Sequence, residues 1–155
     1  MSLNLGNDLM NMIAILMGVL AGACIGIQGG INSQLTKHWA KNSVLASAIS
    51  FLVGALILWA LSFILGVSIP ELSDKLAWWH WTGGILGAYF VYSLVYLSPI
   101  LGASMVVALI LSGQIFAAVV LDHFGLAGYP VRSITEVRLI GIALLGVGVL
   151  IIRKS

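Results

Sequence analysis

Charged side chains are scarce in this sequence. Asp, Glu, Lys and Arg make up 8% of its 155 residues, and the formal net charge is only +2. Soluble globular proteins carry nearer 25% charged residues, so this chain has too little polar surface to cover a water-soluble domain. The weak net charge also gives no electrostatic basis for binding nucleic acid.

Groups that support catalysis or metal binding are equally scarce. The single cysteine, Cys24, excludes an internal disulfide and is typical of a structural thiol. The sequence has no zinc-ligand spacing, no phosphate-binding loop and no nucleophile triad. We therefore expect a protein that is not an enzyme and that has neither a metal site nor a cofactor.

Hydrophobic residues, by contrast, make up 61% of the chain. A membrane-spanning helix needs roughly 20 apolar residues, so 155 residues leave room for five or six crossings and little else. The sequence predicts an all-α integral membrane protein whose residues 1–155 form a single transmembrane domain in the lipid bilayer.

The helix boundaries follow from charges, prolines and glycines. From Leu76 to Leu121 no Asp, Glu, Lys or Arg occurs, a stretch too long for one crossing, and we expect Pro99 with Gly102 to break it. The last helix has a charge-free core of about 21 Å, which predicts that the arginines at its ends snorkel to the two surfaces. The five predicted helices span about 10–32, 44–67, 78–97, 100–121 and 134–152.

Glycines recur every four residues in the first predicted helix, on one face. This small-xxx-small spacing is typical of helices that pack closely in lipid. The predicted packing stripe consists of Gly18, Gly22, Gly26 and Gly30.

Lysine and arginine are balanced between the two sides of a five-helix protein. Lys75, Arg132 and Arg138 would lie on the side of the N-terminus, and four cations would lie on the other side: Lys37, Lys41, Arg153 and Lys154. A difference of one hardly orients a chain by the positive-inside rule. We expect insertion in both orientations and antiparallel pairing; the alternatives are a weak fixed orientation or an oppositely oriented partner subunit.

Polar side chains occur on the first four predicted helices. A stripe of hydroxyls on the third helix predicts a cavity wall, or else interface anchors. Amides at depth in the first and fourth helices are either solute ligands or contacts between helices. Ser43, Ser47, Ser50 and Gly54 form a stripe predicted for packing. The candidate solute-binding residues are Gln28, Asn32, Tyr89, Tyr92, Ser93, Tyr96 and Gln114.

Several motifs then combine. The runs Gln28–Leu35, Ser50–Gly54 and Ser112–Gln114, followed by Leu121–Gly125, together resemble the YdcZ family of the drug/metabolite transporter superfamily. The resemblance implies a five-helix half-transporter that works in pairs, as a multi-pass protein of the plasma (inner) membrane of a bacterium.

A narrower similarity lies in the last helix, whose pattern resembles the dimerisation helix of small multidrug resistance transporters. At 100° per residue Gly141 and Gly148 lie within about 20° of each other, between large residues, although packing within one subunit would use the same strip. The implied dimer interface consists of Gly141, Leu144, Leu145, Gly148 and Val149. The essential glutamate that those transporters carry in their first helix is missing here, so their proton coupling is not implied.

These observations predict a function. We expect a transporter of small organic solutes that works as an antiparallel homodimer by alternating access. Aromatic rings with neutral amides favour an aromatic, amphiphilic or weakly cationic solute. The alternatives are a dual-topology ion channel, or an accessory subunit of another membrane protein.

Overall fold

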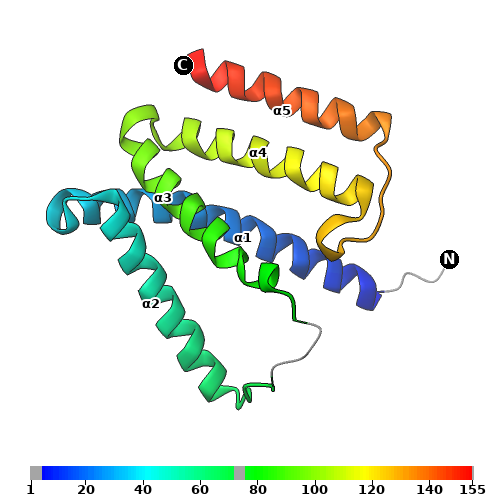
Figure 1. The fold of residues 1–155 in the computed structure, drawn as a ribbon. Helices are drawn as coiled ribbons and strands as arrows, with labels where there is room; N and C mark the ends of the chain where they lie inside the picture. Colours follow the sequence, from blue (N-terminus) through cyan, green and yellow to red (C-terminus); the bar gives the residue numbers. More distant parts are fainter. Residues whose placement is uncertain (1–4, 72–75, 155) are drawn as a thin grey trace. The chain divides into compact units, whose positions relative to one another are not determined.

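The computed structural model describes residues 5–71 and 76–154, and side chains from residue 8 onward. Throughout this part of the chain the regular structure is helical (Figure 1). The chain divides into two compact units, residues 1–99 and residues 100–155, each of which is described by itself. Lys75, which entered the charge count, lies outside the described residues.

The first unit begins with a long helix. The helix α1 (Leu5–Leu35) has 31 residues, which corresponds to roughly 46 Å at 1.5 Å per residue. A hydrocarbon layer is about 30 Å thick, so α1 either tilts or extends beyond it. The predicted helix over 10–32 lies entirely within α1.

A compact turn joins α1 to the next helix. The π-helical turn η1 (Thr36–Ala40) is closed by the Lys41 N–H, which donates to the Thr36 carbonyl at 2.8 Å. The Asn42 side chain then caps α2 (Ser43–Ile64), because its Oδ1 accepts from Val44 N at 2.7 Å and from Leu45 N at 3.3 Å.

A glycine ends α2. Gly66 adopts a φ of 66°, and the Val67 N–H donates back to the Ser62 carbonyl at 2.9 Å. These are the marks of a left-handed helix terminus that only glycine adopts without strain. For this reason α2 stops at Ile64, three residues before the predicted boundary at 67.

The third and fourth helices meet at Gly102 rather than at Pro99. The short 3₁₀ turn η2 (Trp78–Trp81) leads into α3 (Gly83–Leu101), which contains Pro99 in its last turn. A proline so close to a helix end frees few carbonyls, so the helix continues past it. Gly102, with a φ of 80°, separates α3 from α4 (Ala103–Phe124). The predicted boundaries at 97 and 100 are thus each displaced by three or four residues.

The core of the first unit is formed by α3 against the α1–α2 turn. Val91 and Val95 are buried together with Ala40 and Ala46, and Leu35 and Phe90 pack against this cluster. Small side chains near the turn therefore make room for the branched residues of α3.

Two glycines bring the helices of the first unit close together. A Cβ at Gly29 would meet Leu94 Cγ and Cδ1 at 3.1 Å and Ser98 Oγ at 3.3 Å, and one at Gly87 would meet Phe51 Cζ at 3.3 Å. The predicted stripe, Gly18, Gly22, Gly26 and Gly30, has no such neighbour within the described part of this unit. Close approach of α1 to α3 thus depends on Gly29, one residue off the stripe, and the role of the stripe stays a prediction.

The second unit contains α4, the 3₁₀ turn η3 (Leu126–Gly128) and α5 (Glu136–Lys154). Gly125, with a φ of 62°, ends α4, and a Cβ there would lie 2.7 Å from Val131 Cγ2. Glycine is therefore required at this position both by the backbone and by the space available.

Four stretches of the described chain are long and apolar enough to cross a membrane: Asp8–Ala40, Ser43–Ile64, Trp78–Leu101 and Ala103–Phe124. The helix α5 is not among them, since its 19 residues include two charged residues near each end. With most of their large apolar side chains exposed, these helices are those of an integral membrane protein. A fifth crossing by α5 stays a prediction.

Six helical hydroxyls share one type of hydrogen bond. Each hydroxyl donates to the backbone carbonyl four residues earlier, which lies one helical turn back. This is a common pattern for Ser and Thr in helices. The donors are Ser33, Thr36, Ser47, Ser62, Ser98 and Ser112.

Candidate functional site

Two amides of α1 lie on the face that this helix turns toward the rest of the first unit. Gln28 is half-buried, Gly29 is buried, and Asn32 is only 4% exposed. Their spacing of one and four residues places all three on one side of a helix. The sequence predicted that the two amides share a face, and the structure places them there.

Both amides bind the same hydroxyl on α2. Asn32 Nδ2 donates to Ser50 Oγ at 3.1 Å, and Gln28 Nε2 donates to the same oxygen at 3.4 Å. Ser50 was predicted only as a packing residue, although it lies in one of the motifs that indicate the family. The sequence could not predict this role of Ser50, because it depends on a contact between two helices. No pattern within α2 reveals which residues of α1 it faces. We call Gln28, Asn32 and Ser50 the amide cluster.

A pocket of about 270 Å³ borders the amide cluster. Gln28 and Ser50 supply its polar atoms, and the other walls are apolar or glycine. Such a lining, mostly apolar with a few polar groups, is typical of small-molecule sites. We call it the amide pocket; its lining residues are Gln28, Ser50, Phe51, Gly54, Ala55, Leu58 and Val91.

A second pocket, of about 300 Å³, lies between α2 and α3. Two of the predicted site residues, Tyr89 and Tyr92, contribute to its wall. We call it the tyrosine pocket; its lining residues are Val44, Ser47, Ala48, Phe51, Ala88, Tyr89 and Tyr92.

The remaining residues of the predicted α3 stripe lie along the same helix. Tyr96 stacks on Tyr92, with ring centroids 5.7 Å apart and planes inclined by 24°. Ser93 is half-buried, and neither it nor Tyr96 lines the amide pocket or the tyrosine pocket. Gln114 is exposed on α4, in the second unit, and its role stays a prediction.

The predicted dimer strip faces a groove within the second unit. A cavity of about 380 Å³ lies between α4 and α5, and Leu144, Leu145, Gly148 and Val149 contribute to it, whereas Gly141 does not. No atom lies within 4 Å of a Cβ built at Gly141 or at Gly148. The strip thus borders α4 without packing tightly against it, and its role between subunits stays a prediction.

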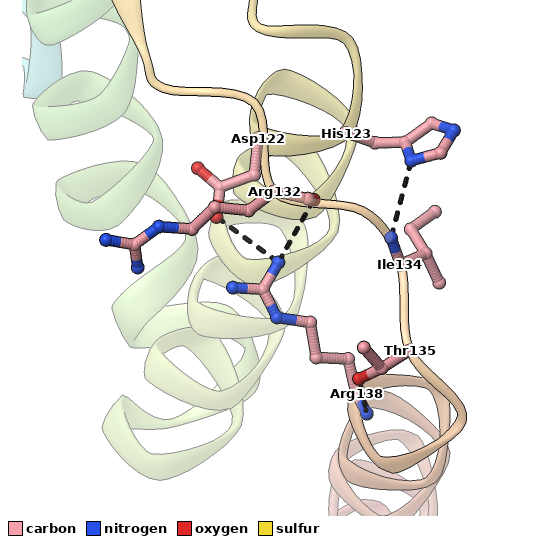
Figure 2. A network of polar contacts seen from close by, with 6 residues as sticks. All are labelled: Asp122, His123, Arg132, Ile134, Thr135 and Arg138. Carbon is pink, nitrogen blue, oxygen red and sulfur yellow. Dashed lines mark hydrogen bonds and ion pairs between the residues drawn. The ribbon is translucent and has the colours of Figure 1, made fainter.

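A polar network fixes the turn between α4 and α5 (Figure 2). Arg138 Nη1 lies 3.5 Å from Asp122 Oδ2 and donates to the Arg132 carbonyl at 3.4 Å. His123 Nδ1 accepts from the Ile134 N–H at 3.3 Å. Arg138, which the sequence predicted to snorkel to a membrane surface, therefore pairs with Asp122 beside the turn between α4 and α5. Because both partners are partly exposed, the ion pair contributes about 0–1 kcal/mol.

The polar atoms of the candidate site are neutral amides and hydroxyls. Within residues 5–71 and 76–154 no group of three His, Cys, Asp or Glu side chains is placed to hold a metal ion. Cys24 is exposed on α1. What the site offers is hydrogen bonding and aromatic contact.

Comparison with known proteins identifies relatives. The family model described as "Putative inner membrane exporter, YdcZ" matches residues 13–151. The chain is also 28% identical over 142 residues to a curated relative from Escherichia coli (strain K12) called inner membrane protein YdcZ, an alignment that covers 88% of this chain and 93% of the relative. No solved structure matches the chain.

Proposed function

The chain belongs to the YdcZ family, and from this we propose that it is an inner membrane transporter that carries small organic solutes by alternating access as an antiparallel homodimer. The family's description as an exporter supports membrane transport in general. The nature of the solute and the mode of action rest on the residues of this chain.

The observation that carries the proposal is the amide cluster with its pocket. Asn32 is almost fully buried, and the amide pocket beside it measures about 270 Å³, close to the lower limit for small-molecule sites. Neutral amides and tyrosine rings bind a solute through hydrogen bonds and ring contacts, without the charge needed to select a metal ion.

The antiparallel dimer is supported by the balance of cations. Three lysines and arginines would lie on one side of a five-helix chain and four on the other, which gives the positive-inside rule almost nothing to act on. Two oppositely oriented copies would recreate the inverted repeat of larger transporters. The two copies would then exchange conformations, so that the cavity opens to each side in turn.

Solute flux tests the transport proposal. Proteoliposomes that contain only this chain would be loaded with mixed cationic, neutral and anionic metabolites, and the release of each would be followed by mass spectrometry. We expect saturable flux, which a Gln28→Leu, Asn32→Leu double variant abolishes. Gln34→Leu is the matched control, because Gln34 is an exposed amide of α1 whose side chain contacts His38 in the following turn.

Other outcomes of this experiment would favour the rival functions. Resolvable single-channel currents in a planar bilayer would mean that the chain is a channel, since a carrier is too slow to give them. Flux that appears only after another membrane protein is added would identify an accessory subunit.

Orientation and pairing are tested separately. Two lysines added beside Lys37 should force one orientation and abolish flux, and coexpression with an oppositely biased variant should restore it. Gly148→Leu should reduce crosslinking between subunits while leaving insertion intact. A single native orientation, or unchanged crosslinking, would refute the antiparallel dimer or its assigned interface.

A further inference from the structure

Phe51 belongs to both pockets of the candidate site. Among the described residues, Phe51 alone lines both the amide pocket and the tyrosine pocket. On α2, the tyrosine pocket is lined by residues from Val44 to Phe51 and the amide pocket by residues from Ser50 to Leu58. The Phe51 side chain therefore forms the shared wall between two neighbouring spaces.

The ring of Phe51 rests on a glycine of α3. A Cβ built at Gly87 would lie 3.3 Å from Phe51 Cζ and 3.6 Å from Cε1. Any other residue at position 87 would press against the ring, so the ring packs here because position 87 is glycine. The Phe51 side chain is nevertheless 39% exposed, and the ring can move away from Gly87 by rotation about its side-chain bonds.

From this geometry we propose that Phe51 is a movable partition that sets the length of solute the chain can hold. The inference rests on the proposed transport function. With the ring on Gly87, a solute occupies one pocket at a time, and each is about as small as a ligand site can be. With the ring displaced, the two spaces join, and a longer solute can reach from Tyr89 and Tyr92 to the amide cluster.

The same arrangement indicates the class of solute. In the amide cluster both side-chain nitrogens donate to Ser50 Oγ, which leaves the amide oxygen of Gln28, the amide that lines the pocket, as an acceptor for a solute N–H. At the other end, the rings of Tyr89 and Tyr92 suit an aromatic group. The favoured solute is an arylalkylamine, in which a short alkyl chain separates the aromatic ring from the amine nitrogen.

Two amines of different length test the partition. Binding of radiolabelled benzylamine and 4-phenylbutylamine to the purified full chain would be measured for the wild type and for Phe51→Ala. We expect the variant to raise affinity for 4-phenylbutylamine relative to benzylamine by at least about fivefold. Phe63→Ala is the matched control, because Phe63 lies on the same helix, is 87% exposed and lines neither pocket. An unchanged ratio between the two amines would overturn the proposal.

A cysteine reporter tests the same wall without any transport. In a Cys24→Ser background, Gly54→Cys places a thiol in the amide pocket, where a Cβ meets no atom within 4 Å. Phe51→Ala should accelerate its reaction with N-phenylmaleimide several-fold, and Phe63→Ala should not. If the wild type binds neither amine and carries no solute, the proposed function fails, and the partition is then judged by this reaction: an unchanged rate overturns it.

Discussion

Asn32 of α1 donates a hydrogen bond from its Nδ2 to the Ser50 Oγ of α2, 3.1 Å away, and this contact joins two helices through a nearly fully buried amide. Inside a membrane protein a polar side chain without a partner is costly, so the pair fixes how the two helices face each other. The same hydroxyl also accepts from Gln28, which makes Ser50 the centre of the cluster.

Ser50→Ala should destabilise the fold. The substitution removes the acceptor of both amides and leaves Asn32 buried without its partner, at a cost of about 1–2 kcal/mol. The measurement is reversible unfolding in mixed micelles. Ser62→Ala is the control, because Ser62 donates only to the Leu58 carbonyl of its own helix. Equal losses for the two variants would mean that the cluster does not hold α1 to α2.

Gly29→Ala should also be destabilising. The added Cβ would lie 3.1 Å from Leu94, a side chain with almost no freedom to move because it is buried, and overpacking of this kind costs about 1–3 kcal/mol. Gly22→Ala, on the predicted stripe, meets no neighbour and should leave the stability of the isolated subunit unchanged. A larger loss for Gly22→Ala would show that the stripe, rather than Gly29, holds the folded chain together.

The tyrosine pocket predicts a graded effect on transport. In the double variant Tyr89→Ala, Tyr92→Ala, solute affinity should fall by about 2- to 30-fold, because the rings supply contact area and cation–π attraction of about 0.5–2 kcal/mol. Changing both residues to Phe keeps the rings and should have a smaller effect. Tyr129→Ala, in the exposed loop of the second unit, is the control for Michaelis measurements in proteoliposomes. Unchanged transport in the double Ala variant would move the solute path away from α3.

Solute flux should depend only weakly on pH. No Asp or Glu occurs between Leu9 and Pro70 or between Leu76 and Leu121, so the two carboxylates of the first four spans, Asp8 and Asp122, lie at the ends of their spans and not at the midplane, where a proton-exchanging group would be expected. Between pH 6 and pH 8 flux should change by less than about threefold.

A triple variant separates this residual dependence from true proton coupling. His80→Gln, Asp122→Asn and His123→Gln together replace the imidazole and carboxyl side chains near the ends of α3 and α4 by neutral amides. The remaining pH dependence of flux should then disappear. A steep transition near neutral pH that survives all three changes would mean that protons couple through another group.

The sequence predicted those features that depend on the spacing of residues within a single helix. Gln28 and Asn32 share a face because of their spacing, and Tyr92 stacks on Tyr96 for the same reason. The sequence named Gly102 together with Pro99 as the break between the third and fourth helices, but the exact ends of α2, α3 and α4 depend on the positive φ of Gly66 and Gly102, which spacing alone does not reveal.

What depends on contact between helices was harder to predict. Gly29 was overlooked because it lies outside the four-residue repeat, yet it faces Leu94. Ser50 and Phe51 acquire their roles only when α2 meets α1 and α3. Hydropathy is uninformative here, since an apolar face in lipid gives no indication of which neighbour it meets.

The hydroxyls that bond within their own helices also matter during biosynthesis. A serine or threonine whose hydroxyl donates to a carbonyl one turn earlier needs no partner on another helix, so most of α2 can leave the insertion machinery for lipid without waiting for one. Gln28 and Asn32 instead donate to Ser50, which lies on another helix. We therefore expect α1 to be retained at the exit from the translocon until Ser50 has emerged from the ribosome.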